Sequence, residues 1–256
     1  MKAKSSNKCV SAFKKYLYMK FDGYCLPGMY AEEAMDHFVG KHGQRLRLPN
    51  LVDDVSYQHA ISKRKDTYEL RLKYGIPAKK RVFFCPARLL KLKGLDLFLK
   101  SAGKVKGISK ACFLLAGEGP MKKELQDIAD KENLDVHFMG YCNQDTVIEF
   151  YALSDFFFLP SLQDCNPLSA IEAAFAGLPL CVSIYTGNSP ELIQPYKNGV
   201  VFDILDTEEV QACIYFLLNA SEEWVSNAGR ESLAIAQNSF ACINETKKFL
   251  AQLREG

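Results

Sequence analysis

Two acidic residues, Asp164 and Glu172, lie eight positions apart in the chain, after the apolar run 156–159. That run has the length and composition of a buried strand. Asn166 is a strong helix N-cap residue and Pro167 suits the first helical position, so we expect a strand-to-helix turn between the two carboxylates. The sequence therefore places Asp164 in the loop and Glu172 inside the helix.

The start of this predicted helix is a candidate anion site. The free N–H groups of a first helical turn, here near Leu168 and Ser169, point away from the helix and attract anions, phosphate above all. Carboxylates beside such a site can accept hydrogen bonds from hydroxyl groups. The combination suits a ligand with both hydroxyls and phosphates, such as a nucleotide sugar.

From residue 81 onward, apolar runs of strand length alternate with segments of helical spacing. The strand-like runs are 81–86, 111–116, 136–139, 156–159, 180–184 and 199–202. Helical patterns lie between them and fill most of 207–253. Strands that alternate with helices predict an α/β fold, a doubly wound, Rossmann-like parallel sheet with helices on both faces.

Distinctive polar residues follow the ends of these predicted strands. Arg88 and Lys93 come after the first strand, Gly119 and its neighbours after the second, and Asp164 after the fourth. Open parallel sheets bind ligands outside the carboxyl ends of their strands. Arg88 and Lys93 flank a loop that ends in Gly94, where two cations could clamp a diphosphate. The competing interpretation is an ordinary surface loop and, at Gly119, an ordinary helix start.

The first 75 residues follow a different pattern. They predict a helix at 8–20, a strand at 22–26, a helix at 30–39, a strand at 45–48 and a turn-rich linker at 49–54. Two strands are too few for an independent doubly wound domain, so this piece looks like the end of something larger. We therefore divide the chain into residues 1–54 and a ligand-binding domain at 55–256.

Composition excludes several classes of protein. The net charge is only +2, although residues 79–110 hold ten Lys and Arg against the single acid Asp96. This basic stretch could bind phosphate, nucleic acid or an anionic membrane, but a solvated helix face is the simpler interpretation. It lacks the aromatic interleaving of a nucleic-acid module, so we expect no nucleic-acid partner.

The cysteines and the apolar runs indicate location. No two of the nine cysteines are closer than 16 positions, which excludes a C-x-x-C motif, and the four histidines have no cysteine partners at zinc-finger spacing. We expect small core cysteines in a reducing compartment and no metal site. No apolar run approaches the roughly 20 residues of a membrane span, and residues 1–8 lack a signal-peptide core. The expected location is cytoplasmic, with at most peripheral contact at the inner membrane surface.

Five motifs in order resemble the donor-binding domain of the retaining GT-B glycosyltransferases, glycosyltransferase family 4, often called group 1. The resemblance spans about residues 20–250. The motifs are Arg88-x4-Lys93-Gly94, Gly117-Glu118-Gly119-Pro120, Asp164-x7-Glu172-Ala173, Gly177-x-Pro179, and Glu191-Leu192-Ile193 with Asn198-Gly199. Pro49-Asn50 with Asp53 resembles the interdomain segment of these enzymes.

The resemblance implies roles for the residues. Arg88 and Lys93 would hold the donor's phosphates, Asp164 would contact the transferred sugar, and Glu172 would bind the nucleotide ribose. The other residues expected to bind the donor are Gly119, Asn166, Pro167, Leu168 and Ser169. The implied reaction transfers a sugar from a UDP- or GDP-linked donor to an unknown glycan or lipid-linked acceptor, with retention and without a cofactor or bound metal. The chain also lacks the metal-binding Asp-x-Asp motif of the other large glycosyltransferase fold.

Two departures from the family pattern matter. The family has Glu where this chain has Asp164, whose side chain is one methylene shorter. The acceptor-binding N-terminal domain is largely missing, so residues 1–54 would be its remnant with the interdomain linker, and a partner chain could supply the rest. No histidine sits in a matching catalytic context. The final helices, from Phe240 to Leu253, would return to the N-terminal part and could expose apolar surface. The alternative function is a non-catalytic nucleotide-sugar-binding or scaffold module.

Overall fold

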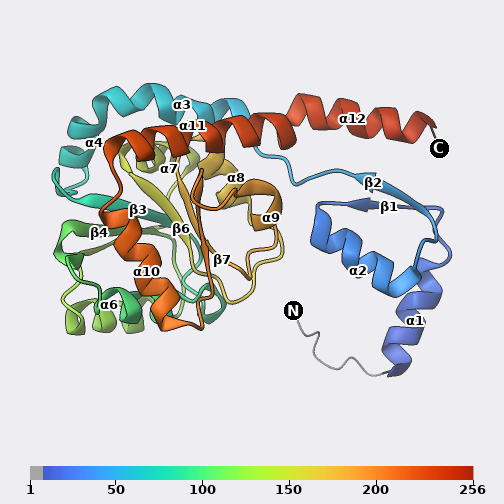
Figure 1. The fold of residues 1–256 in the computed structure, drawn as a ribbon, viewed down its shortest axis with the longest axis horizontal. Coiled ribbons are helices and arrows are strands. Elements are labelled where there is room, and N and C mark those ends of the chain that lie inside the picture. The colour runs from blue at the N-terminus through green and yellow to red at the C-terminus, as the bar shows by residue number, and fades with distance from the viewer. Residues whose placement is uncertain (1–7, 256) are drawn as a thin grey trace.

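The computed structural model describes residues 8–255 of the 256-residue chain. The prediction that residues 1–8 lack a signal-peptide core concerns mainly residues 1–7, which lie outside the described residues. Two parts lie side by side, a large one with a six-stranded sheet and a small one with a two-stranded sheet (Figure 1). Within residues 8–255, none of the helices is long and apolar enough to cross a membrane.

The six-stranded sheet confirms the predicted doubly wound architecture. Its strands are β3 (Arg81–Pro86), β4 (Ala111–Ala116), β5 (Val136–Gly140), β6 (Phe156–Leu159), β7 (Leu180–Ser183) and β8 (Gly199–Phe202). They lie in the order β5-β4-β3-β6-β7-β8, and every neighbouring pair is parallel. The predicted bounds agree with the observed ones to within one residue.

The strand order creates a switch point between β3 and β6. From β3 the chain proceeds outward to β4 and β5, and it then returns to the centre and proceeds the other way through β6, β7 and β8. The loops that follow β3 and β6 therefore lead to opposite sides. In doubly wound sheets, the crevice at the carboxyl ends of two such strands is where ligands bind. The sequence pattern predicted the strands but not this order.

Two helical layers cover the sheet (Figure 1). One layer contains α3 (Asp54–Lys63), α4 (Thr67–Lys73), α7 (Gln144–Leu153), α8 (Leu168–Phe175) and α11 (Glu222–Ser239). The other contains α5 (Leu95–Ala102), α6 (Lys122–Lys131) and α10 (Thr207–Leu218). The short helix α9 (Ser189–Leu192) and the 3₁₀ turns η1 (Arg64–Asp66), η2 (Lys91–Lys93) and η3 (Ile108–Lys110) lie in connections.

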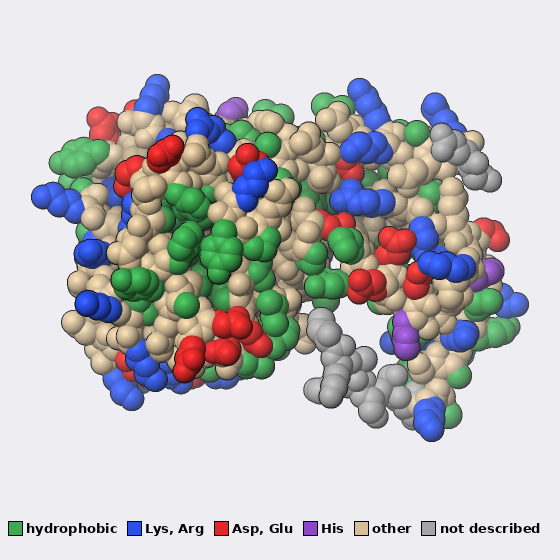
Figure 2. Space-filling model, viewed as in Figure 1, with side chains coloured by type: hydrophobic (Ala, Val, Ile, Leu, Met, Phe, Trp, Pro, Cys, Tyr) green, Lys and Arg blue, Asp and Glu red, His purple; other side chains and the backbone are tan. Residues whose placement is uncertain are grey.

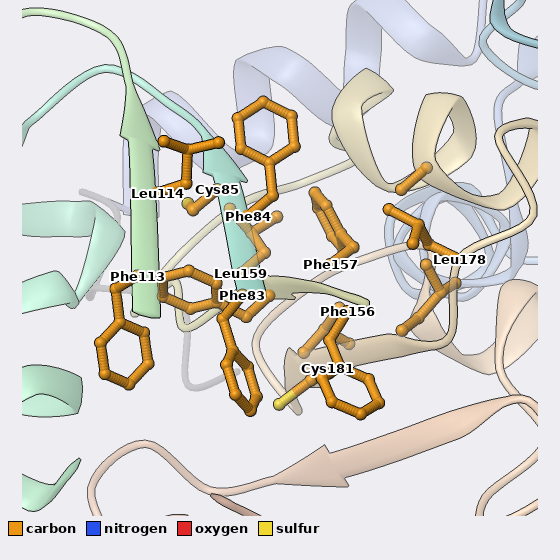
Figure 3. Close-up of a cluster of buried hydrophobic side chains, with 14 of the residues drawn as sticks. Phe83, Phe84, Cys85, Phe113, Leu114, Phe156, Phe157, Leu159, Leu178 and Cys181 are labelled. Atoms are coloured by element: carbon orange, nitrogen blue, oxygen red, sulfur yellow. The ribbon is translucent and has the colours of Figure 1, made fainter. Parts of the chain in front are cut away.

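Aromatic side chains of the central strands form the centre of the core (Figure 3). The rings of Phe83 and Phe156 lie 4.9 Å apart across neighbouring strands, and Phe98 from α5 stacks on Phe158 at 4.8 Å. All four side chains are fully buried. Because helices cover both faces, these strands are apolar at nearly every position instead of alternating. The rigid core fixes where each strand ends, and therefore where each loop begins.

The small part contains the elements predicted for the first 48 residues. They are α1 (Lys8–Tyr18), β1 (Gly23–Leu26), α2 (Met29–Val39) and β2 (Gln44–Arg47), with β1 and β2 parallel. Its buried hydrophobic residues include Tyr24, Leu26, Val39 and Leu46. Residues 48–53 connect it to α3 without forming a helix or a strand.

The last helix, α12 (Cys242–Glu255), crosses from the large part to the small part (Figure 1). Arg47 forms an ion pair with Glu245 at 2.7 Å, and its backbone N–H donates to the Gln252 side chain at 3.0 Å. Ile243 and Leu250 remain exposed on the outer side. The expected return of the final helix, and its exposed apolar side chains, are both observed.

Several cations of the basic stretch 79–110 are paired with acids. Lys80 pairs with Asp135, Arg81 with Glu222, and Lys93 with Asp164. These acids lie outside the stretch in sequence, so only the fold brings them together. On the face shown in Figure 2, positive and negative side chains are interspersed.

Gly94 is the point where the loop after β3 meets the loop after β6. Its φ is +64°, a conformation that favours glycine, and an added Cβ would clash with the carbonyl oxygen of Pro160. Gly75 has almost the same φ, +67°, but an added Cβ there would have no atom within 4 Å. Substitutions at these two glycines therefore distinguish the effect of backbone strain from the effect of close packing.

We expect Gly94→Ala to lower the free energy of unfolding more than Gly75→Ala does. The Gly75 variant carries only left-handed strain, about 1–2 kcal/mol, whereas the Gly94 variant adds overpacking of about 1–3 kcal/mol. Urea denaturation of both variants measures the difference. Equal losses would show that the two loops do not pack as closely as the structure has them.

Candidate functional site

The side chains of Lys93 and Asp164 meet at the switch point. Lys93 ends η2 after β3, and Asp164 lies in the loop after β6. The Lys93 Nζ lies 2.5 Å from Asp164 Oδ2, and the two side chains are 21% and 17% exposed. Partial burial reduces solvent screening of this pair, so it holds the two loops in a fixed relation while leaving both groups open to a ligand.

The loop after β7 holds Asp164 through its backbone. The Asp164 N–H donates to Tyr185 O at 3.1 Å, and Asp164 O accepts from the Gly187 N–H at 2.7 Å. A Cβ at Gly187 would clash with the carbonyl of Cys165, so only glycine permits this approach. The polar segment after the fifth predicted strand therefore supports the Asp164 loop.

Arg88 is exposed, and within residues 8–255 its guanidinium has no hydrogen-bond or ion-pair partner. Its loop packs against the loop after β4, where the Leu89 N–H donates to Glu118 O at 3.0 Å. A Cβ at Gly119 would clash with the Leu89 backbone. Gly119 thus allows close contact between the two loops, and the exposed Arg88 lies in the first of them.

Glu172 lies beside two tyrosines that no sequence pattern connected with it. The Tyr151 hydroxyl, from α7, donates to Glu172 Oε2 at 3.0 Å, and the ring of Tyr57, from α3, packs edge-on against Tyr151 at 5.9 Å. Burial raises the pKa of Glu172, while hydrogen bonds from the two tyrosines oppose the rise. These partners lie 21 and 115 positions away in sequence, so no local pattern could have identified them.

The predicted start of α8 is wrong by one residue. The helix begins at Leu168, and Pro167 occupies the cap position with φ −68° and ψ 124°. Asn166 does not cap the helix; its Nδ2 donates to Pro27 O at 3.5 Å instead. Asn188 Nδ2 donates to Pro167 O at 3.0 Å, which fixes the proline from the loop after β7. The first-turn N–H groups still begin at Leu168 and Ser169.

Three side-chain oxygens beside this turn are buried and, within residues 8–255, have no hydrogen-bond partner. They are Asn166 Oδ1, Thr186 Oγ1 and Asn188 Oδ1. Buried polar atoms are normally hydrogen-bonded to protein or water. Their position between the loops after β6 and β7 leaves hydrogen-bonding capacity for a water molecule or a ligand hydroxyl.

Cys85 lies beneath the ion pair, near the end of β3. Burial raises the pKa of its thiol to about 12, and the charges of Lys93 and Asp164 act on it in opposite directions. A thiol in this state is protonated and unreactive at neutral pH. Cys85 is therefore a core residue, as the sequence predicted for the cysteines within strand-like runs.

The small part reaches the site at the Asp164 loop. Asn50 Nδ2 donates to Asn166 O at 3.1 Å, and Arg47 lies 3.7 Å from Glu191 of α9. A cavity of about 320 Å³ lies beside this junction and is lined by Gly28, Glu191 and neighbouring residues. A larger cavity of about 530 Å³ lies at the amino ends of the central strands, away from the site.

Solved structures share this fold. Sucrose-phosphate synthase from Thermosynechococcus elongatus superposes with a TM-score of 0.81 at 18% identity, covering all of this chain and 64% of that chain. Anabaena HepE, solved in complex with UDP-glucose, superposes with a TM-score of 0.77 at 17% identity, covering 98% of this chain and 69% of that chain. The large part is thus a Rossmann-like unit of the GT-B class.

The chain belongs to the group 1 glycosyltransferase family, whose model matches residues 66–231. Sulfoquinovosyl transferase SQD2 of Arabidopsis thaliana is 31% identical over 193 residues, which cover 73% of this chain and 36% of that protein. The matched region includes β3 to β8 and therefore Arg88, Lys93, Asp164 and Glu172.

We expect Glu172→Gln to stabilise the folded protein at neutral pH. Because burial raises the pKa of Glu172, the folded state binds the carboxyl proton more tightly than the unfolded chain does. The ionised group therefore costs folding free energy above its folded pKa, and this cost disappears below the ordinary value of 4.5. Glutamine keeps an oxygen for Tyr151 without the charge.

Thermal unfolding between pH 4 and 7 measures this effect. A cost of about 1 kcal/mol would raise the unfolding temperature by about 2–4 °C at pH 7, with less gain towards pH 4. Glu33→Gln, at an exposed position of α2, is the control and should change little. A lower unfolding temperature for Glu172→Gln at pH 7 would contradict the assignment.

Proposed function

We propose that this chain is the donor-binding half of a retaining, nucleotide-sugar-dependent glycosyltransferase of family 4. In this proposal residues 55–256 bind the donor, and residues 1–54 are the end of an acceptor domain together with the interdomain linker. The proposal is supported by family membership and by one observation above all. The Lys93–Asp164 pair lies at the switch point of the sheet, where doubly wound folds bind their ligands.

Arg88 and Lys93 bind the donor's diphosphate in this proposal. A lysine ammonium carries three donors, so Lys93 can keep its contact with Asp164 while it donates to a phosphate oxygen. Arg88 has no internal partner within residues 8–255 and can add a bidentate contact. Both cations would stabilise negative charge on the diphosphate as the sugar bond breaks.

In this proposal, Asp164 and Glu172 accept hydrogen bonds from the donor's hydroxyl groups. Asp164 would orient the transferred sugar beside the diphosphate, and Glu172, held by Tyr151, would accept hydrogen bonds from the ribose. The first-turn N–H groups at Leu168 and Ser169 would add anion contacts, while Asn166 and Pro167 shape the turn and Gly119 keeps the facing loop close. Asp164 replaces the glutamate of the family pattern, so its shorter reach depends on the fixed loop position.

The remaining features of the reaction follow from the family resemblance. We propose a UDP- or GDP-linked donor, transfer with retention to a glycan or lipid-linked acceptor, and no cofactor or catalytic metal. A partner chain could supply the rest of the acceptor domain, and the expected location is the cytoplasm or the inner membrane surface. Anabaena HepE, a structure of the same fold, was solved with UDP-glucose.

The second candidate is a nucleotide-sugar-binding or scaffold module without turnover. It is considered because the matched segment spans only 36% of the sulfoquinovosyl transferase. Both candidates require the same donor pocket, so nucleotide binding tests what they share. Sugar transfer in the presence of an added acceptor domain distinguishes them, since the module would bind the donor and never turn it over.

We expect calorimetry to show 1:1 binding of UDP or GDP. Lys93→Ala removes a charge-assisted hydrogen bond worth about 1.5–3 kcal/mol and should weaken binding by roughly 10- to 100-fold. Glu172→Ala should weaken binding of the nucleotide but not of inorganic pyrophosphate, because in this proposal Glu172 binds the ribose. Lys100→Ala removes an exposed lysine of α5 and is the matched control.

Other binding results would contradict the proposed donor site. If neither nucleotide binds, or if Lys93→Ala and Glu172→Ala bind like the control while circular dichroism shows them folded, the crevice is not a donor site. Equal loss of pyrophosphate and nucleotide binding in Glu172→Ala would remove the ribose role alone.

A further inference from the structure

A second group of chemically active side chains lies at the opposite end of the sheet from Lys93 and Asp164. Cys112 is the second residue of β4, His137 is the second residue of β5, and Asp135 directly precedes β5. Their ligand atoms all lie within 4.8 Å of one another. Within residues 8–255 this is the one group of three or more His, Cys, Asp or Glu side chains with that geometry.

The strand register explains why these three side chains meet. Leu114 pairs with His137, and Phe113 with Val136, so Cys112 and Asp135 lie one step further back on the two strands. The Phe113 N–H donates to Asp135 O at 2.8 Å, which holds this register. Because residues two apart in a strand share a face, Cys112, Asp135 and His137 all lie on one face of the sheet.

We propose that Cys112, Asp135 and His137 form a zinc site. Zinc binds thiolate sulfur, imidazole nitrogen and carboxylate oxygen at about 2.0–2.3 Å, usually with tetrahedral geometry, whereas magnesium and calcium take oxygen ligands. The set offers one atom of each kind, and a water molecule would complete the fourth position. On binding, Cys112 releases its thiol proton to solvent and the sulfur–zinc bond replaces the sulfur–hydrogen bond.

The surrounding contacts are compatible with an ion. His137 Nε2 lies 3.0 Å from Asp135 Oδ1, a separation that zinc could span with a small shift of both groups. Lys80 Nζ contacts the other oxygen, Asp135 Oδ2, at 2.9 Å, so the lysine can stay in place while Oδ1 turns to the metal. The side chains of Asp135 and His137 are each 26% exposed, which gives an ion access to the buried Cys112.

The ion would act on the edge of the sheet. Strand β5 is an edge strand, and all five of its residues are only partly buried. A zinc ion bound to Cys112 and His137 would tie β5 to β4 through side chains in addition to the backbone hydrogen bonds. Binding to the folded state alone would raise the unfolding temperature with zinc concentration.

The test uses the full chain after treatment with a chelator. We expect zinc chloride to bind in a 1:1 ratio by calorimetry, and Co²⁺ to give a thiolate charge-transfer band in the near ultraviolet. Asp135→Asn and His137→Gln keep all nine cysteines and should each weaken zinc binding by at least ~10-fold. Cys112→Ser should abolish the cobalt band.

Two controls keep the result specific. His59→Gln changes an exposed histidine of α3, and Cys142→Ser changes a cysteine just beyond β5; both should bind zinc like the unchanged protein. Unfolding temperatures of all variants without metal check their folds. The proposal is overturned if the unchanged chain shows no saturable binding, or if folded Asp135→Asn and His137→Gln variants bind zinc as tightly as it does.

Discussion

The ion pair between Lys93 and Asp164 depends on two loops that approach each other where the sheet reverses its order. That approach is possible because glycines replace side chains at the contacts: Gly94 lies against Pro160, and Gly187 against Cys165. The aromatic core fixes the strands, the glycines let their loops meet, and the ion pair then joins the loops. The ion pair therefore depends on the loop contacts, and the loop contacts depend on the packing of the whole sheet.

Much of the fold could be predicted because its signals are local. Apolar runs such as Phe156–Leu159 identified the strands, and the polar residues after them placed the site at their carboxyl ends. The partners could not be predicted, because they depend on strand order: Lys93 with Asp164, and Glu172 with Tyr151. The helix start was misplaced because Asn166, a good capping residue, bonds to Pro27 in a distant loop instead.

Several contacts join the small N-terminal part to the large part, among them those of Arg47 with Glu191 and of Asn166 with Pro27. The segment 48–53 brings Asn50 to the carbonyl of Asn166, and α12 brings Glu245 and Gln252 to Arg47. Movement of the small part would therefore act directly on the loop that carries Asp164. This connection gives a physical route by which groups outside the large part could influence the Asp164 loop.

The most direct measurement is a crystal structure of the chain with bound UDP. The account predicts the diphosphate beside Lys93 and Arg88, within hydrogen-bond reach of the first turn of α8, with the ribose hydroxyls on Glu172. A nucleotide bound elsewhere, for example in the cavity at the amino ends of the strands, with the Lys93–Asp164 crevice filled only by water, would contradict it.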